Sequence, residues 1–180
     1  MRRMKTVTAL VAAASLAMVG LGATSANAAA GDTATTFTLT SGTLSISVPA
    51  TALLIGSTTT GSGSVSGSLG GVSVADLRGN ISSVWTATVS STVFTTGAAT
   101  ANETVAKANV AYTSGAGTAQ ALQVGAFVPS VSSALTSPAT AGTWAGVGNN
   151  TVSWTPSLTF TLIPSQVAGV YSGTINHSVL

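Results

Sequence analysis

Cysteine is missing from the 180-residue chain, and charge is scarce, with five lysines and arginines and three acids. Without cysteine there is no disulfide framework and no thiolate metal site, so a fold must depend on apolar burial and hydrogen bonds. The single histidine, His177, and the scattered acids Asp32, Asp76 and Glu103 do not make a metal-binding set. We therefore expect no metal and no other cofactor.

Catalytic motifs are missing as well. No serine lies in a G-x-S-x-G nucleophile elbow, and the chain has no glycine-rich phosphate loop. Glycoside hydrolysis needs two carboxylates that flank the bond, and only three acids exist. Spacing alone leaves a serine–histidine–aspartate arrangement open, because its members meet only in the fold. His177 shares the strand parity of Tyr171, Ile175 and Val179, which favours a packed histidine. We predict that the protein is not an enzyme.

Positive charge is concentrated at the start of the chain, where three basic residues precede an apolar, small-residue stretch over residues 6–23. Ala26-Asn27-Ala28 follows as an A-x-A cleavage site, which completes the pattern of a secretory signal peptide. An uncleaved anchor is the alternative, but the stretch is only marginally long for a span and is rich in alanine and glycine. We expect residues 1–28 to be a signal peptide and residues 29–180 to be one domain without a stable membrane span.

Removal of the signal peptide leaves Arg78 and Lys107 against the three acids, a formal charge of 2 − 3 = −1. Nucleic-acid binding requires a basic face, so this class of partner is excluded. Such low charge is unusual for a freely dissolved protein, since net charge keeps molecules apart. Export without disulfides, from an alanine-rich leader, favours a bacterial cell-surface protein.

Alternating apolar and hydroxyl side chains dominate the remainder of the chain, most clearly over residues 151–180. Successive side chains of a strand point to opposite faces, so this alternation predicts half-buried strands. A turn over residues 164–169 separates two such runs, and Tyr171 lies on the apolar parity of the second. The apolar parity of the first run is shared by Val152, Trp154, Leu158, Phe160 and Leu162.

A similar run covers residues 72–94, where Asp76 and Arg78 stand two apart. On a strand they point to the same face and can pair, so we expect a structural ion pair, with a binding acid and base as the alternative. No stretch after the leader has helical apolar spacing, and threonine, valine and serine suit pleated surfaces. The fold class that follows is all-β, an antiparallel β-sandwich of short strands.

The three tryptophans fall into two groups. Trp85 and Trp154 sit in alternating runs, so we expect both to be core residues between two sheets. Trp144 is surrounded by alanine, glycine and threonine without alternation, in a region (120–150) that we interpret as one or two short strands and a surface excursion. A tryptophan on a loop is a candidate contact for a sugar or a partner protein, because its large rigid face binds at low entropic cost. The alternative is that it folds back onto the core.

Asp76-Leu77-Arg78-Gly79, with the run from Trp85 to Ser90, resembles the first half of a WxL-type cell-surface domain. Residues 153–160 and 168–175 are similar to the second half of its actinobacterial relatives. Neither tryptophan keeps the W-x-L motif itself, because Trp85 precedes Thr86-Ala87 and Trp154 precedes Thr155-Pro156. The resemblance implies a secreted β-sandwich on a Gram-positive bacterium, held non-covalently on the cell wall through peptidoglycan or with partner surface proteins.

A structural subunit of an extracellular fibre is the alternative function. Long, uncharged threonine and valine strands with few lysine or proline residues at their edges are prone to edge-to-edge pairing. The chain ends within the alternating run at Leu180, and residues 29–36 could add a strand to the sheet of a neighbour. Homo-oligomers formed by strand pairing are therefore a second expectation.

Overall fold

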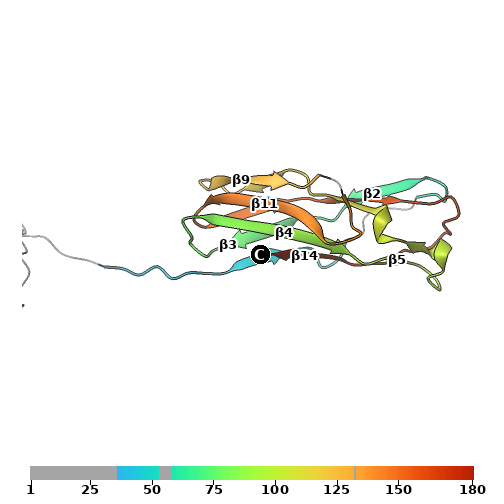
Figure 1. Cartoon of the computed structure of the whole chain (residues 1–180), viewed down its shortest axis with the longest axis horizontal. Helices are drawn as coiled ribbons and strands as arrows, with labels where there is room; N and C mark the ends of the chain where they lie inside the picture. Colours follow the sequence, from blue (N-terminus) through green and yellow to red (C-terminus); the bar gives the residue numbers. More distant parts are fainter. Residues whose placement is uncertain (1–35, 53–57, 132) are drawn as a thin grey trace, which may run out of the picture. The chain divides into compact units, whose positions relative to one another are not determined.

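The computed structural model describes residues 36–52, 58–131 and 133–180. The chain divides into two units between Thr38 and Leu39, and every strand belongs to the second unit, Leu39–Leu180. This unit is an antiparallel β-sandwich, which confirms the predicted fold class (Figure 1). Within the described residues, no helix has the length and apolar character needed to cross a membrane.

One layer of the sandwich is built from two four-stranded sheets that follow each other along the strands. The order of the first sheet is β1 (Leu44–Ser47), β3 (Val72–Asp76), β12 (Asn150–Trp154), β8 (Gly117–Ala119). The order of the second is β10 (Ser133–Ala134), β7 (Val110–Thr113), β13 (Ser157–Thr161), β2 (Ser64–Ser68). Three chain segments run from one sheet into the other, so the two sheets share one interior face.

The breaks between these two sheets lie side by side. The amide of Leu69, between β2 and β3, donates to the carbonyl of Pro156, between β12 and β13, at 2.9 Å. Gly70 and Gly115 have φ values of 84° and 72°, a conformation that other residues rarely adopt. Proline has no amide hydrogen for a ladder, and glycine permits the sharp change of direction, so these residues end one sheet and start the next.

The opposite layer is one four-stranded sheet. Its order is β14 (Ile175–Val179), β4 (Ser83–Ser91), β11 (Ala139–Val147), β9 (Val124–Pro129). Strand β14 lies next to β1 along one side of the sandwich, and β9 lies next to β8 along the other. A pair of two-residue strands, β5 (Phe94–Thr95) and β6 (Thr104–Val105), and the short 3-10 helices η1 (Ala101–Glu103) and η2 (Lys107–Asn109) lie in the connections.

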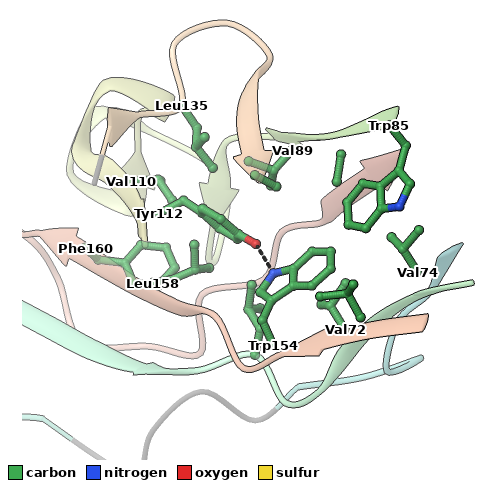
Figure 2. Close-up of a cluster of buried hydrophobic side chains, with 14 of the residues drawn as sticks. Val72, Val74, Trp85, Val89, Val110, Tyr112, Leu135, Trp154, Leu158 and Phe160 are labelled. Atoms are coloured by element: carbon green, nitrogen blue, oxygen red, sulfur yellow. Dashed lines mark hydrogen bonds between the residues drawn. The ribbon is translucent and has the colours of Figure 1, made fainter. Parts of the chain in front are cut away.

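Aromatic rings fill the core between the layers (Figure 2). The rings of Trp85 and Trp154 are stacked with centroids 6.4 Å apart, and the ring of Phe127 is stacked on Trp154 at 5.1 Å. Glycine at positions 117 and 142 makes this possible, because a Cβ at either position would overlap the Phe127 ring. The expectation that Trp85 and Trp154 are core residues is confirmed, since they are 1% and 2% exposed.

Strand predictions were correct where both apolar parity and a partner strand exist. Residues 72–76, 83–91, 150–154 and 157–161 form strands with the expected faces buried. The final strand is shorter than expected and begins at Ile175, which leaves Tyr171 in the preceding loop. Residues 36–43, which have the same alternation, form no strand.

Region 120–150 departs most from expectation, because it contains two substantial strands, β9 and the nine-residue β11. The register of β11 against β4 shifts between Thr140 and Gly142, so Ala141 is an extra residue in a β-bulge. The bulge changes which parity faces inward. This hides the strand from a search for strict alternation.

Candidate functional site

Trp144 does not lie on a surface loop. It is in the middle of β11, is 2% exposed, and stands opposite Trp85 of β4 and Phe127 of β9, which places it on the interior face. A Cβ at Gly125 or Gly146 would overlap its indole, so the small residues around Trp144 provide space for the ring. Of the two alternatives for Trp144, a loop contact and a tryptophan that folds onto the core, the structure supports the second, and the ring face is not open to a ligand.

The pairing of Asp76 and Arg78 is confirmed. Arg78 Nε donates to Asp76 Oδ1 and Arg78 Nη2 to Asp76 Oδ2, both at 2.9 Å, and the hydroxyl of Ser83 donates to Oδ2 at 2.7 Å. Asp76 is 1% exposed. The hydrogen bonds from Arg78 and Ser83 outweigh the effect of burial and lower the pKa of Asp76 to about 2, so the carboxylate is ionised at neutral pH.

This ion pair belongs to a buried polar network that joins both layers. Asn150 of β12 donates to the hydroxyl of Ser83 at 2.6 Å and accepts from the indole of Trp85 at 2.9 Å. Asp76 and Asn150 are register partners on β3 and β12, and Ser83 starts β4. The side chains of this network bond to one another across the two layers, so the network stabilises this end of the sandwich.

A second polar contact crosses the core at Tyr112. Its hydroxyl accepts from the indole of Trp154 at 3.1 Å (Figure 2) and lies 3.2 Å from Nε2 of His177 on β14. The hydroxyl of Tyr112 has a proton and further acceptor capacity, so it donates to Nε2 of His177 or accepts from it according to the tautomer of the histidine. Burial lowers the pKa of His177 to about 4 and raises the pKa of Tyr112 to about 12, so both are neutral at pH 7.

His177 is not part of a serine–histidine–aspartate arrangement among the described residues. Within the described part of the chain it makes no hydrogen bond to a serine or a carboxylate, which a serine–histidine–aspartate arrangement requires. Glu103 lies elsewhere, where its carboxylate accepts from the amide and hydroxyl of Thr100 at 3.0 and 2.8 Å and caps η1. Asp32 lies outside the described residues. No group of three or more metal-ligating side chains occurs among residues 36–52, 58–131 and 133–180.

Tyr171 holds two loops together. Its hydroxyl lies 2.8 Å from the carbonyl of Val167 and 3.1 Å from that of Asn102, and it accepts from the amide of Gln166 at 3.2 Å. Gln166 is itself buried and also donates to the carbonyl of Thr104 at 3.2 Å. The position of Tyr171 is therefore structural, as expected, although it acts from a loop rather than a strand.

A shallow hollow of about 340 Å³ contains Lys107, the only lysine in the described chain, beside Leu135. The other side chains around it carry hydroxyl or amide groups and include those of Ser90, Thr92 and Asn176. No carboxylate lines it. One exposed cation in an open hollow does not constitute a catalytic site.

Hydroxyl groups cover the outer faces of both layers. On the β14–β4–β11–β9 sheet, Thr86 stands opposite Thr143 and Thr88 opposite Thr140, and Thr88 Oγ1 lies 2.7 Å from Ser178 Oγ. The opposite layer carries the same chemistry, including Ser73, Ser153, Thr159 and Thr161 in outward positions. None of these named positions is charged, so they offer hydrogen-bond donors and acceptors rather than ion pairs.

An apolar strip occupies the margin of the same outer face at β9. We define it as Val84, Val124, Ala126, Val128, Ala145 and Val147, all exposed. The register makes it continuous, because Val84 stands opposite Ala145, Ala145 opposite Ala126, and Val147 opposite Val124. Its four valines are 53–68% exposed, which is unusual for a set of adjacent apolar side chains.

The turn that leads into β9 adds to this surface. Leu122 is fully exposed and has a φ of 69°, a conformation that a bulky side chain rarely adopts. The turn is anchored to β12, where the amide of Thr151 donates to the side-chain oxygen of Gln123 at 3.0 Å. Sequence reasoning missed this region. The available signal was the alternation of Val124, Ala126 and Val128 with Gly125 and Phe127.

Comparisons of the chain with known protein families, with curated proteins and with solved structures find no match. The likeness to WxL-type domains therefore stays a prediction from the quoted residues. Function has to be argued from the surfaces described above.

Proposed function

We propose that this chain is an exported, non-catalytic protein of a Gram-positive cell surface that acts by binding, through non-covalent association with peptidoglycan or with other surface proteins. The observation that carries the proposal is the uncharged, hydroxyl-covered outer face of the sandwich. The side chains of Asp76 and Arg78 pair with each other, and His177 lies beside the hydroxyl of buried Tyr112, so these groups have structural contacts that do not require a catalytic role.

The burial of Trp144 changes where a glycan contact would lie. Because the side chain of Trp144 is only 2% exposed, the structure gives no support to a sugar ring stacking on its indole. Hydrogen bonding to the central threonines Thr86, Thr88, Thr140 and Thr143 takes its place, since glycan hydroxyl and amide groups are matched by a surface of small donors and acceptors. These residues lie on the two nine-residue strands β4 and β11, which give the surface a rigid base.

Retention on purified peptidoglycan sacculi tests the proposal. The chain from Ala29, the expected secreted form, should be retained saturably. A double Thr86→Val and Thr143→Val variant keeps the strand shape but loses two hydroxyls, so its affinity should fall ~tenfold if each lost hydrogen bond contributes about 0.7 kcal/mol. Thr159→Val with Thr161→Val, on the opposite layer, is the matched control and should bind as the parent does. Equal binding by all three proteins would show that this face is not the contact.

A fibre subunit is the second candidate function, and the apolar strip favours it. Natural proteins protect edge strands with lysine, proline or bulges, whereas β9 reads V-G-A-F-V-P, carries no charge along its length and has proline only at its last position, Pro129. Negative-stain microscopy of the purified chain distinguishes the two functions. Filaments support the fibre, and dispersed particles that bind sacculi support the wall-associated module.

A further inference from the structure

We propose that residues 36–40 of one copy of this chain add as a strand to the free edge of β9 in a second copy. The inference deepens the second candidate function above, self-assembly, by naming the two surfaces that meet. It is independent of whether the assembled protein binds peptidoglycan.

The donor segment has the pattern of a strand without a strand to pair with. Residues 36–40 read T-F-T-L-T, so Phe37 and Leu39 share one face and threonines occupy the other. The side chains of Phe37 and Leu39 are 83% and 87% exposed, and residues 36–43 belong to no strand. Two large apolar side chains exposed on an extended, uncharged segment are typical of a surface that a partner covers.

The acceptor is the outer edge of β9. This strand pairs with β11 on one side, and no other strand of the described chain pairs with it on the other. A six-residue strand with one open edge and no charged side chain is a template for an added strand. Pro129 lacks an amide hydrogen and limits the pairing at that end, so the strand offers residues 124–128.

The two surfaces match in spacing and chemistry. Val124, Ala126 and Val128 project from the outer face of β9 at every second position, as Phe37 and Leu39 do on the donor. Strand addition places cross-strand side chains about 4.5–5.5 Å apart, so Phe37 and Leu39 would lie against this apolar row. The strip is widest at β9, and Leu122 extends it at the start of the strand.

The donor must come from another copy, because its own β9 is out of reach. The amide of Gly42 is bonded to the carbonyl of Leu77 at 2.8 Å, next to β1 and β3. Strand β9 lies next to β8, which is at the opposite margin of this sheet from β1. The distance from β1 to β8 is three strand spacings, or about 14 Å, and β9 lies beyond it. Leu39 is only three residues from Gly42 and extends about 11 Å at most, so it and residue 40 cannot reach β9 of the same chain, and the segment 36–40 cannot pair there along its length.

Donor and acceptor are different surfaces, so the contact is heterologous. Each copy then keeps one free donor and one free acceptor, and association continues into open chains rather than closed dimers. A mixing experiment tests this property directly. The donor variant carries Phe37→Asp and Leu39→Asp, and the acceptor variant carries Ala126→Lys, which places a charge in the middle of the β9 edge.

The masses of the chain from Ala29 and of both variants are measured by sedimentation over a range of concentrations. The parent should form a concentration-dependent series of oligomers, and each variant alone should stay monomeric. An equimolar mixture of the two variants should restore one contact and stop at the dimer. Val170→Lys changes a valine that is 84% exposed and distant in sequence from both surfaces, and it should assemble as the parent does.

A parent that stays monomeric at millimolar concentration would overturn the inference, as would variants that assemble normally or a mixture that yields no dimer. Circular dichroism confirms that each variant is folded, and Val128→Lys replaces Ala126→Lys if that variant does not fold. Sacculus binding by the monomeric variants separates the two claims. Binding without assembly leaves the wall-associated function intact, whereas assembly without binding leaves only the fibre.

Discussion

Trp85 and Trp144 stand opposite each other on β4 and β11, yet their indole N–H groups have different environments. The N–H of Trp85 donates to Asn150, which is 1% exposed, at 2.9 Å. The N–H of Trp144 is buried without a partner among the described residues. Two core tryptophans of similar burial therefore allow the contribution of one hydrogen bond to be measured.

Replacement of each tryptophan by phenylalanine makes this comparison. Both substitutions remove the same atoms and leave a similar cavity, but Trp85→Phe also leaves the side-chain oxygen of Asn150 without that donor. We expect Trp85→Phe to lower the free energy of unfolding by about 1–2 kcal/mol more than Trp144→Phe does. Urea denaturation measures both values. Equal losses would contradict a structural role for the Trp85–Asn150 bond.

His177 should make stability depend on pH in a defined window. Burial lowers its pKa from 6.5 to about 4, so the unfolded chain binds more protons than the folded protein between these values. Its contribution to stability is complete above about pH 6.5 and is lost as the pH falls toward 4. Asp76, with a pKa lowered from 3.8 to about 2, acts only below this window.

Melting temperatures at pH 7 and pH 4.5 measure this effect. The parent should lose stability between the two values, and His177→Gln, which cannot take up a proton but keeps an acceptor for Tyr112, should lose less. If the variant and the parent show the same decrease, His177 does not control this part of the pH profile.

At the scale of the elements, the buried polar network ties β3, β4 and β12 together through Asp76, Ser83 and Asn150. Removal of one partner from a buried pair costs about 3–5 kcal/mol because it leaves an uncompensated charge. The side chain of Arg78 is 31% exposed, so solvent screens part of this effect.

We expect Arg78→Ala to lower the free energy of unfolding and to move acid unfolding to higher pH, since Arg78 is the main cause of the low pKa of Asp76. Lys107→Ala removes the same charge from an exposed position and should change stability by less than about 0.5 kcal/mol. Denaturation at pH 7 and at pH 3 provides both readings. A loss no greater than that of the Lys107 variant would mean that the network does not stabilise the junction.

Alternation of apolar and polar residues predicted the strands in which one parity faces the core throughout. Val152, Trp154, Leu158 and Phe160 are all buried as expected, because one parity faces the core through both β12 and β13 despite the break at Pro156. Strand β11 was missed because its bulge changes the parity of the inward positions. The segment with Phe37 and Leu39 has the alternation of a strand but no partner, since pairing depends on a neighbour that periodicity does not identify.

At the scale of the whole molecule, the composition predicted the low charge of the surface, but it did not identify the residues on that surface that could contact a partner. Because charged residues are scarce, the outer faces of both layers carry mainly hydroxyl groups. The ion pair of Asp76 and Arg78 is structural, as expected. Trp144 was misplaced because small neighbours, which indicate a loop in sequence, here accommodate a large ring in the core. The apolar strip depends on register between β4, β11 and β9, which no local pattern contains.

Binding of the chain from Ala29 to purified sacculi is the most direct measurement of the central claim, that this protein acts by association through an uncharged face. We predict saturable retention of the parent, reduced ~tenfold by the Thr86→Val and Thr143→Val pair and unchanged by Thr159→Val with Thr161→Val. No retention of the parent at any concentration would contradict the claim for peptidoglycan and leave assembly through β9 as the function of this surface.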